Sequence, residues 1–335
     1  MDPVSQAALG AACAQSAVRR PQFAAASLCG VVGGLAPDLD VLIQSDTDPL
    51  LALEFHRHFT HSLAFVPVGA LLCALLLFPL CRRYLRFPVC YGFCGLGYAS
   101  HGLLDACTSY GTQLFWPFSR ERIAFDIISV VDPLFTLPLI ALVIWGAVRR
   151  HSRFAVAGIA WGLGYLGLGA IQNQRATAVA IDLAAARGHT PVAITVKPSF
   201  GNILLWKTIY EDSGRFYVDA VRVFVGSTVF VGESRQKLDL VRDFPWLGPD
   251  SQQRRDMERF SWFASGYLAL DEQNRNRIVD MRYSLVPNRG DGLWGIELDP
   301  GAVPEAHAAY VTMRVRSVAE GRELLGMLFQ GDRMP

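Results

Sequence analysis

The chain has 335 residues, of which 51% are hydrophobic and 18% charged, and its formal net charge is +1. This composition is too apolar for an ordinary soluble protein of this length, and it has no basic excess of the kind that nucleic-acid binding needs. All seven cysteines fall within the first 107 residues, which excludes a disulfide framework in the remainder of the chain.

Charge is unevenly distributed along the chain. Residues 1–174 contain 11 arginines, no lysine and 10 acidic residues, whereas residues 175–335 contain 20 basic and 20 acidic residues. We therefore expect an α-helical integral membrane domain over residues 1–174 and a small soluble α+β domain over residues 175–335.

Uncharged runs in the first half predict four to six membrane helices. Arg19 and Arg20 separate two short apolar segments that favour a tilted helical hairpin or a re-entrant pair, Pro3–Val18 and Pro21–Pro37. Four further runs follow, at Leu63–Cys81, Phe87–Ser100, Pro133–Val148 and Phe154–Gln174. The second and third of these reach the roughly 20 residues that cross a bilayer only by including His101–Asp105 and Asp126–Asp132. No basic stretch precedes the first segment, so a cleaved signal peptide is not expected.

Arginine positions predict the orientation of these helices. Eight of the 11 arginines of the first half lie in three clusters, namely Arg19–Arg20, Arg82–Arg86 and Arg149–Arg153. These clusters fall at alternate helix ends and therefore on one face of the membrane, which the positive-inside rule makes cytoplasmic. We expect a multi-pass membrane protein whose polar site and C-terminal domain are extracytoplasmic; the resemblance described below implies that this membrane is the bacterial inner membrane.

The polar residues of the first half gather at the opposite helix ends. They lie in four stretches, "APDLD", "FHRHFTH", "HGLLDACTSYG" and "FDIISVVDP", which contain four of the seven histidines. An unpaired carboxylate at membrane depth costs several kcal/mol, and a divalent cation offsets that cost by coordination. The joint pattern favours a metal site.

Each stretch also has a simpler interpretation. Asp38 and Asp40 fit a solvated helix end, and His56 and His58 fit an interfacial position. His101 and Asp105 are four residues apart, so they share a helix face and fit a buried hydrogen-bonded pair. Only the combination of the stretches makes the metal site the better interpretation.

The chemistry of the candidate ligands narrows the choice of metal. Imidazole nitrogen with carboxylate oxygen suits zinc, manganese or iron, with zinc first, and the number of candidates allows one or two ions. The cysteines lie mostly inside apolar segments and form no CxxC pair, so we interpret them as small buried hydrophobic residues.

A family resemblance rests on four blocks in residues 1–150, namely "APDLD", "HRHFTHSL", "HGLLDACTSYGTQLFWPFS" and "DIISVVDPLFTLPL". They resemble the YdjM-type family of inner-membrane-associated proteins, described as metal-dependent hydrolases and as LexA-binding. The resemblance implies functional roles for Asp38, Asp40, His56, His61, His101, Asp105 and Asp132. The family's block reads HRGxTHS, and its glycine position is His58 here, so His58 ranks below His56 and His61 as a ligand.

We expect these residues to have different roles. The predicted metal ligands are Asp38, Asp40, His56, His61, His101 and Asp105, and the predicted catalytic carboxylates, which orient water or move its proton, are Asp132 and Asp126. Arg57, Arg120 and Arg122 are the arginines outside the cytoplasmic clusters and are expected to bind an anionic head group. The alternative for "SRERIAF" is an exposed loop. Aromatic residues in "TSYGTQLFWPFS" favour contact with membrane lipids.

The second half predicts a helix in "NQRATAVAIDLAAARGH" that ends at Gly188, followed by a hairpin in "RFYVDAVRVFVGSTVFVGE". Further strands are expected in "RFSWFASGYLAL", "NRIVDMRYSLVPN" and "GLWGIEL", and "VTMRVRSVAEGRELLGMLF" predicts a strand and then a final helix. This domain has no nucleotide-binding loop or catalytic triad, and it either caps the site or binds a protein partner that the sequence does not identify.

Three functions compete on these grounds. The first is an integral-membrane metal-dependent hydrolase that acts on a lipid or another phosphoester at the extracytoplasmic face. The second is a metal or proton transporter, which is weaker because the polar residues gather at one face instead of running through the bundle. The third is an intramembrane protease, weakened because no HExxH motif occurs.

Overall fold

A computed structural model describes residues 1–313 and 317–329 of the chain. The chain folds into two compact units. The first unit comprises Met1–Leu42, Phe55–Ile171 and Phe200–Asn202. The second comprises Ile43–Glu54, Gln172–Ser199 and the chain from Ile203 onward. The segment Ile43–Glu54 thus belongs with the C-terminal half, although it comes early in the sequence.

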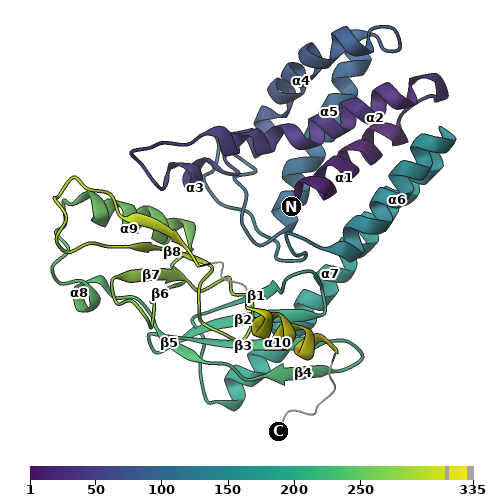
Figure 1. Ribbon diagram of the computed structural model, residues 1–335. Helices are drawn as coiled ribbons and strands as arrows, with labels where there is room; N and C mark the ends of the chain where they lie inside the picture. The colour runs from purple at the N-terminus through teal and green to yellow at the C-terminus, as the bar shows by residue number, and fades with distance from the viewer. Residues whose placement is uncertain (314–316, 330–335) are drawn as a thin grey trace. The chain divides into compact units, whose positions relative to one another are not determined.

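Helices build the first unit (Figure 1). Its main helices are α1 (Pro3–Ser16), α2 (Phe23–Leu35), α4 (Val66–Cys81), α5 (Phe87–Cys107), α6 (Pro133–Arg149) and the first part of α7 (Ser152–Ala186). Short 3-10 turns connect them, namely η1 (Arg20–Gln22), η2 (Ala36–Leu42), η3 (Phe59–His61) and η4 (Leu63–Phe65). The carboxylates of Asp2 and Asp132 cap α1 and α6, each accepting two backbone N–H bonds in the first turn.

Glycines allow α1, α2 and α5 to pack unusually closely. A Cβ atom on Gly10 would lie 2.3 Å from the carbonyl oxygen of Gly30, and one on Gly33 would lie 2.3 Å from that of Cys94. A Cβ on Gly97 would lie 2.4 Å from the Gly30 oxygen. Such small-residue contacts are typical of helix packing in membranes, where close backbone approach replaces the hydrophobic effect. They hold α2 and α5 together immediately before the turn that carries Asp38 and Asp40.

Three helical stretches in the described part of the chain are long and apolar enough to cross a membrane, at Arg20–Leu42, Leu63–Cys81 and Ser152–Ala186. Helix α6 is apolar but shorter, with 17 residues. The outward faces of these helices are apolar, as at Leu76 and Leu80 of α4, which are 71% and 70% exposed. Leucines exposed to this degree suit a lipid environment better than water.

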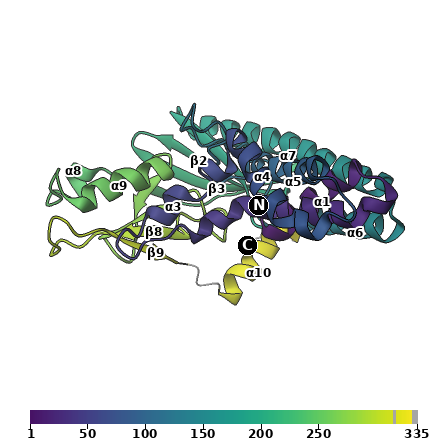
Figure 2. The same cartoon turned by 90° about the horizontal axis from the view of Figure 1, so that it is seen from above.

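The second unit combines two antiparallel sheets with helices (Figure 2). The first sheet has the order β1-β2-β3-β4 with β5 also paired to β3, and the second has the order β6-β7-β8-β9. Their strands are β1 (Ala193–Pro198), β2 (Leu205–Asp212), β3 (Arg215–Val223), β4 (Ser227–Phe230), β5 (Ser234–Gln236), β6 (Leu268–Leu270), β7 (Arg277–Asp280), β8 (Trp294–Glu297) and β9 (Ala309–Thr312). The remaining helices are α3 (Leu51–Phe55), at the boundary of the two units, α8 (Leu240–Asp243), α9 (Gln252–Phe263) and α10 (Val318–Phe329).

Apolar residues of both sheets share one core in this unit. Ile209, Phe216 and Val218 of the first sheet pack with Ala269 and Val279 of the second. Leu324 and Met327 place α10 over Leu205 and Ala220 of the first sheet. The unit is therefore an α+β domain, as the sequence predicts.

Several local expectations for the C-terminal half are confirmed and others are wrong. The hairpin at β3–β4 is present, with its break at Gly226. "RFSWFASGYLAL" is not a strand throughout, because residues 259–263 end helix α9 and only Leu268–Leu270 pair. The apolar residues Phe260 and Phe263 fit the buried face of a helix, which single-sequence pattern does not separate from a short strand. The expected helix ending at Gly188 is the end of the continuous 35-residue α7, so the expected boundary after Gln174 lies inside a helix.

Strand β2 contains a buried lysine. The Lys207 side chain is 3% exposed, and its ammonium donates to Ser284 Oγ at 2.7 Å and to the carbonyl oxygen of Arg289 at 2.6 Å. Burial outweighs the nearby carboxylates and lowers the pKa of Lys207 to about 7.

This lowered pKa predicts a pH dependence for the second unit. In the unfolded chain Lys207 keeps its ordinary pKa near 10.5, so between about pH 7 and 10.5 the unfolded state binds more protons than the folded state. The free energy of unfolding should therefore rise with pH across that window, by at most roughly 1.4 kcal/mol per pH unit. Pulse proteolysis in urea at pH 7 and pH 9 measures the effect, and Lys207→Met should flatten it. An equal rise in the Lys207→Met protein would assign the pH dependence to other groups.

Candidate metal centre

Three parts of the first unit bring the predicted ligands together. Turn η2, which continues α2, carries Asp38 and Asp40. The segment before α4 carries His56 and His61, and the last two turns of α5 carry His101 and Asp105. The ligands therefore converge because α2 and α5 pack closely and the segment before α4 folds over their ends.

Four side chains meet around one point. The Nε2 atoms of His61 and His101 are 2.9 Å apart. Asp38 Oδ1 lies 3.4 Å from each of these two nitrogens. Asp105 Oδ2 lies 3.3 Å from His61 Nε2 and 3.5 Å from His101 Nε2. All four ligand atoms lie within 4.8 Å of one another.

These separations fit a tetrahedral cation. With metal–ligand bonds of 2.0–2.1 Å, the edges of a tetrahedron are about 3.3–3.4 Å. Four of the ligand–ligand separations are within about 0.2 Å of that length, and the His61–His101 separation is shorter. The geometry matches a site with two imidazoles and two carboxylates.

Hydrogen bonds fix which nitrogen of each imidazole points inward. His101 Nδ1 lies 2.6 Å from the carbonyl oxygen of Gly34, which can only accept, so Nδ1 carries a proton. His61 Nδ1 faces Asp40 Oδ2 at 3.3 Å and Thr60 Oγ1 at 3.0 Å. In the neutral tautomers that these contacts favour, both Nε2 lone pairs point at the same place. Metal-binding histidines are oriented in the same way, by a carboxylate or carbonyl on the other ring nitrogen.

The site stabilises positive charge strongly. Burial by itself would lower the pKa of His61, but the carboxylates of Asp105, Asp38 and Asp40 outweigh burial and raise it to about 10. A divalent metal cation, which has a higher charge than a proton, would neutralise the same carboxylates and leave the imidazole nitrogens free to bind it. Asp105 Oδ2 is buried and lies 3.1 Å from Arg57 Nε, 3.3 Å from His61 Nε2 and 3.5 Å from His101 Nε2, so this oxygen points into the ligand group.

Asp40 and His56 form a second group beside the first. Asp40 accepts bonds from His56 Nδ1 at 2.9 Å, from the backbone N–H of Arg57 at 2.8 Å and from Thr60 Oγ1 at 3.2 Å. Asp38, Asp40 and His56 also bring three ligand atoms within 4.8 Å of one another. Because Asp38 belongs to both groups, the arrangement has room for two neighbouring cations that share one carboxylate.

Two of the three predicted anion-binding arginines line the site. Arg57 is 4% exposed, and its Nε lies 3.1 Å from Asp105 Oδ2. Its φ of +63° is a left-handed conformation that costs a residue with a side chain roughly 1–2 kcal/mol, and such strain is concentrated at functional sites. Arg57 and Arg122 each stack on the ring of Tyr110, 4.9 and 5.2 Å from its centroid. Arg120 is exposed and has no part in this arrangement.

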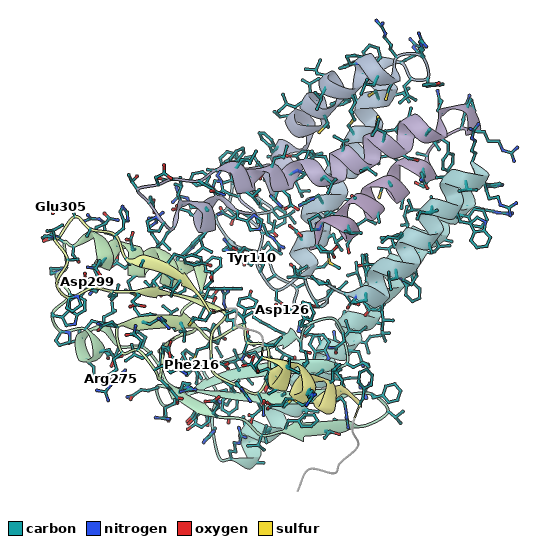
Figure 3. All side chains as sticks on the ribbon, in the orientation of Figure 1. Tyr110, Asp126, Phe216, Arg275, Asp299 and Glu305 are labelled. Atoms are coloured by element: carbon teal, nitrogen blue, oxygen red, sulfur yellow. The ribbon has the colours of Figure 1, made fainter. Side chains whose placement is uncertain are left out.

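The structure places the two predicted catalytic carboxylates outside both ligand groups. Asp132 caps α6, and both of its carboxylate oxygens lie 2.9 Å from the Tyr165 hydroxyl, which donates one shared hydrogen bond. Asp126 has a φ of +54° in the loop between α5 and α6 (Figure 3).

His58 lies among aromatic rings and belongs to neither ligand group. Its ring centroid is 5.3 Å from that of Phe55, 5.9 Å from Phe59 and 5.5 Å from Trp116. The structure thus gives this histidine a packing environment, in the position where the resembling family has glycine.

We predict that His58 is not an obligatory ligand. Replacing His58 by glycine should leave metal content near that of the unaltered protein, because His56 and His61 hold the contacts to the carboxylates. Elemental analysis of the purified proteins measures this, with His61→Ala as the depleted reference. A loss as deep as that of His61→Ala would mean that this chain has a different ligand set.

Sequence reasoning missed several side chains that shape the site. Thr60 lies between the predicted ligands in "FHRHFTH" but carried no signal of its own. Gln6 donates to Asp105 Oδ1 at 2.9 Å, and the α-amino group of Met1 contacts the same oxygen. Both come from residues 1–6, far along the chain from the motifs, so only the packing of α1 against α5 brings them to the site.

A further group of acids in the second unit is already neutralised. Asp48, Asp256 and His307 bring three ligand atoms together. The guanidinium of Arg259 pairs with Asp48 at 2.9 Å and with Asp256 at 3.2 Å. His307 Nδ1 lies 2.9 Å from the other oxygen of Asp256. This cluster is therefore an ion-pair network that ties Ile43–Glu54 to α9.

Comparison with known proteins agrees with the region that holds the site. The pattern of the family described as "YdjM inner membrane protein" matches residues 1–176, which is more than half of the chain and includes every residue of both ligand groups. The chain belongs to the YdjM family.

Two relatives of this YdjM-family chain have been named. The chain is 36% identical over 97 residues to "Inner membrane protein YbcI" of Escherichia coli (strain K12), covering 28% of this chain and 54% of that protein. It is 29% identical over 129 residues to "Uncharacterized protein YfhP" of Bacillus subtilis (strain 168), covering 37% of each. The chain thus spans about a third to a half of these relatives. No solved structure matches it.

Family membership and the apolar helices together support localisation to the inner membrane. They also support a membrane unit with a candidate metal centre, while the names of the relatives assign no reaction. The expected resemblance to the YdjM family is confirmed.

Proposed function

We propose that this YdjM-family protein is an integral-membrane metal-dependent hydrolase. The observation that supports the proposal best is the set of four ligand atoms from Asp38, His61, His101 and Asp105, whose separations approach the edges of a tetrahedron. Borderline nitrogen ligands with hard carboxylate oxygens suit zinc first, with manganese or iron as the alternatives. The group formed by Asp38, Asp40 and His56 provides for a second ion.

A bound ion of this kind lowers the pKa of a coordinated water and polarises the bond to be cleaved. The protein's own residues do the rest. Asp40 holds His61 through Nδ1 and keeps Nε2 directed at the ion. The Gly34 carbonyl does the same for His101. Together they hold the ligands in place before substrate arrives.

Where the group of Asp38, His61, His101 and Asp105 alone holds an ion, proton transfer fits the His56–Asp40 pair best. His56 is 28% exposed, so it lies on the accessible side of the centre, and its Nδ1 is held by Asp40 Oδ1. Its Nε2 is then the atom that accepts a proton from water. In this proposal Asp132 keeps its place as a helix cap, and Asp126 belongs to the neighbouring loop.

The substrate class that we propose is a phosphoester, on a lipid or at the membrane surface. Arg57 and Arg122 both stack on Tyr110, and guanidinium groups suit phosphate oxygens because they donate two parallel bonds. The loop before Arg122 exposes Phe115 and Phe118, which are 49% and 89% exposed and fit an interfacial position.

Purified full-length protein tests the proposal. Metal content measured by elemental analysis should be one or two equivalents, and turnover should appear against phosphatidic acid in mixed micelles or against a soluble phosphoester. Both should fall together in His61→Ala. Metal flux into proteoliposomes without any hydrolysis would favour the transporter instead, and protein that is correctly folded but binds no metal would refute the proposal.

We further propose that the site and the C-terminal domain face away from the cytoplasm, because the three arginine clusters lie at the other helix ends. Alkaline phosphatase fused after Pro335 should be active, and a fluorescent protein that folds only in the cytoplasm should be dark there. The reverse result would invert the orientation.

A further inference from the structure

A second cluster of metal-binding side chains lies in the first unit, and it consists only of thiols. Cys29 of α2 and Cys90 and Cys94 of α5 place their sulfur atoms within 4.8 Å of one another. The Sγ atoms of Cys29 and Cys90 are 3.6 Å apart. Three cysteines from two helices therefore share one place.

Helix packing accounts for this meeting. Cys90 and Cys94 are one turn apart on α5 and point to one side. The closest approach of α2 and α5 is at Gly33 and the carbonyl of Cys94, so Cys29, one turn before Gly33, comes to face this pair. Since α2 and α5 continue from here to Asp38 and His101, the thiols lie roughly 10 Å along α5 from the candidate metal centre.

Among the described residues, the polar contacts of these thiols are with other thiols. Cys29, Cys90 and Cys94 are 0% exposed. Their neighbours in this core are apolar residues such as Ala26, Ala74 and Phe93. Such a pocket excludes water and has no imidazole or carboxylate that would attract a harder cation.

We propose that Cys29, Cys90 and Cys94 form a sulfur-only site for a soft d10 cation, Cu(I) or a thiophilic divalent ion, separate from the His/Asp centre. With metal–sulfur bonds near 2.3 Å, the sulfur atoms of a three-coordinate site lie about 4.0 Å apart. The three sulfur atoms here lie within 4.8 Å of one another, with 3.6 Å between Cys29 and Cys90. Thiolate ligands select Cu(I) and zinc-like ions over magnesium or manganese. The proposal does not depend on the function of the His/Asp centre.

Titration of full-length protein in detergent, with its thiols reduced, tests this site. Cu(I) and Cd(II) serve as separate probes, and the signal is the sulfur-to-metal charge-transfer absorption, which a His/Asp centre does not give. One equivalent of at least one probe should produce this absorption. Cys29→Ala and Cys90→Ala should each weaken binding by 10-fold or more, whereas Cys107→Ala, a cysteine outside the cluster, should not.

Two further results make the outcome decisive. His61→Ala should leave the absorption intact, because the two sites share no ligand. X-ray absorption at the metal edge of the unaltered protein reads the number of sulfur ligands directly, so it holds even where a cysteine variant fails to fold. Three sulfur ligands support the site, and a response to Cu(I) alone or to both probes identifies the cation. The absence of the band with both probes, or a metal ligated by oxygen and nitrogen alone, would overturn the proposal.

Discussion

Replacing Asp105 by asparagine should reduce bound metal and hydrolysis together by on the order of 10-fold or more in protein that remains folded and inserted. Asp105 is 0% exposed, and its Oδ2 faces both inward-pointing imidazole nitrogens. The neutral amide coordinates more weakly and removes a charge that balances the cation, and changes at metal ligands have effects of this size. Elemental analysis and turnover on the same preparation measure both quantities.

A second buried carboxylate of the same unit provides the control. Asp132→Asn should cost stability, because Asp132 caps α6 and accepts the Tyr165 hydroxyl, but it should leave the metal in place. Normal metal content and normal turnover in folded Asp105→Asn protein would refute the metal centre. Metal loss in Asp132→Asn equal to that in Asp105→Asn would show that the assay reports folding instead of ligation.

Gly33→Ala should destabilise the membrane unit by roughly 1 kcal/mol, with a fall in the midpoint of thermal unfolding in detergent. The added Cβ would lie 2.3 Å from the carbonyl oxygen of Cys94, and a backbone atom cannot rotate away as a side chain can. Overpacking of this kind costs about 1–3 kcal/mol, which outweighs the roughly 1 kcal/mol by which alanine favours a helix.

Gly92→Ala on α5 is the matched control, since no atom lies within 4 Å of the Cβ it would add. It should leave the midpoint unchanged or raise it slightly, because only the helix preference changes. If Gly33→Ala behaves like Gly92→Ala, the close contact between α2 and α5 is not what holds the ends of these helices together.

The candidate centre was predictable to the extent that its ligands are charged and its surroundings are not. His101 and Asp105 stand out because they occur four residues apart at the end of an apolar run. Asp38 stands out because it follows an apolar run, and His61 because it precedes one. Their convergence follows from the alternation of helix ends. Asp132 gave the same signal for a different reason, since a buried helix cap beside Tyr165 also needs a carboxylate.

What sequence reasoning missed depends on contacts between distant segments. The meeting of Cys29 with Cys90 was missed because the two lie 61 positions apart and no local spacing links them. The end of helix α9 was predicted to be a strand because it has too few buried aromatic residues to show a helical period. The apolar run ends at Gln174, close to the start of this part of the second unit at Gln172, but the helix itself runs on to Ala186.

The glycine contacts among α1, α2 and α5 have a consequence for how the centre exchanges its ion. Zinc fingers obtain their folding energy from the metal and unfold when it is removed. Here backbone packing positions η2 and the end of α5, so the ligands keep their places whether or not an ion is held. A chelator should therefore empty the centre reversibly and leave the helices intact. On the proposed function, the ion that this centre takes up in the cell would depend on the relative supply of competing metals and on their intrinsic affinities, with no refolding step to discriminate among them.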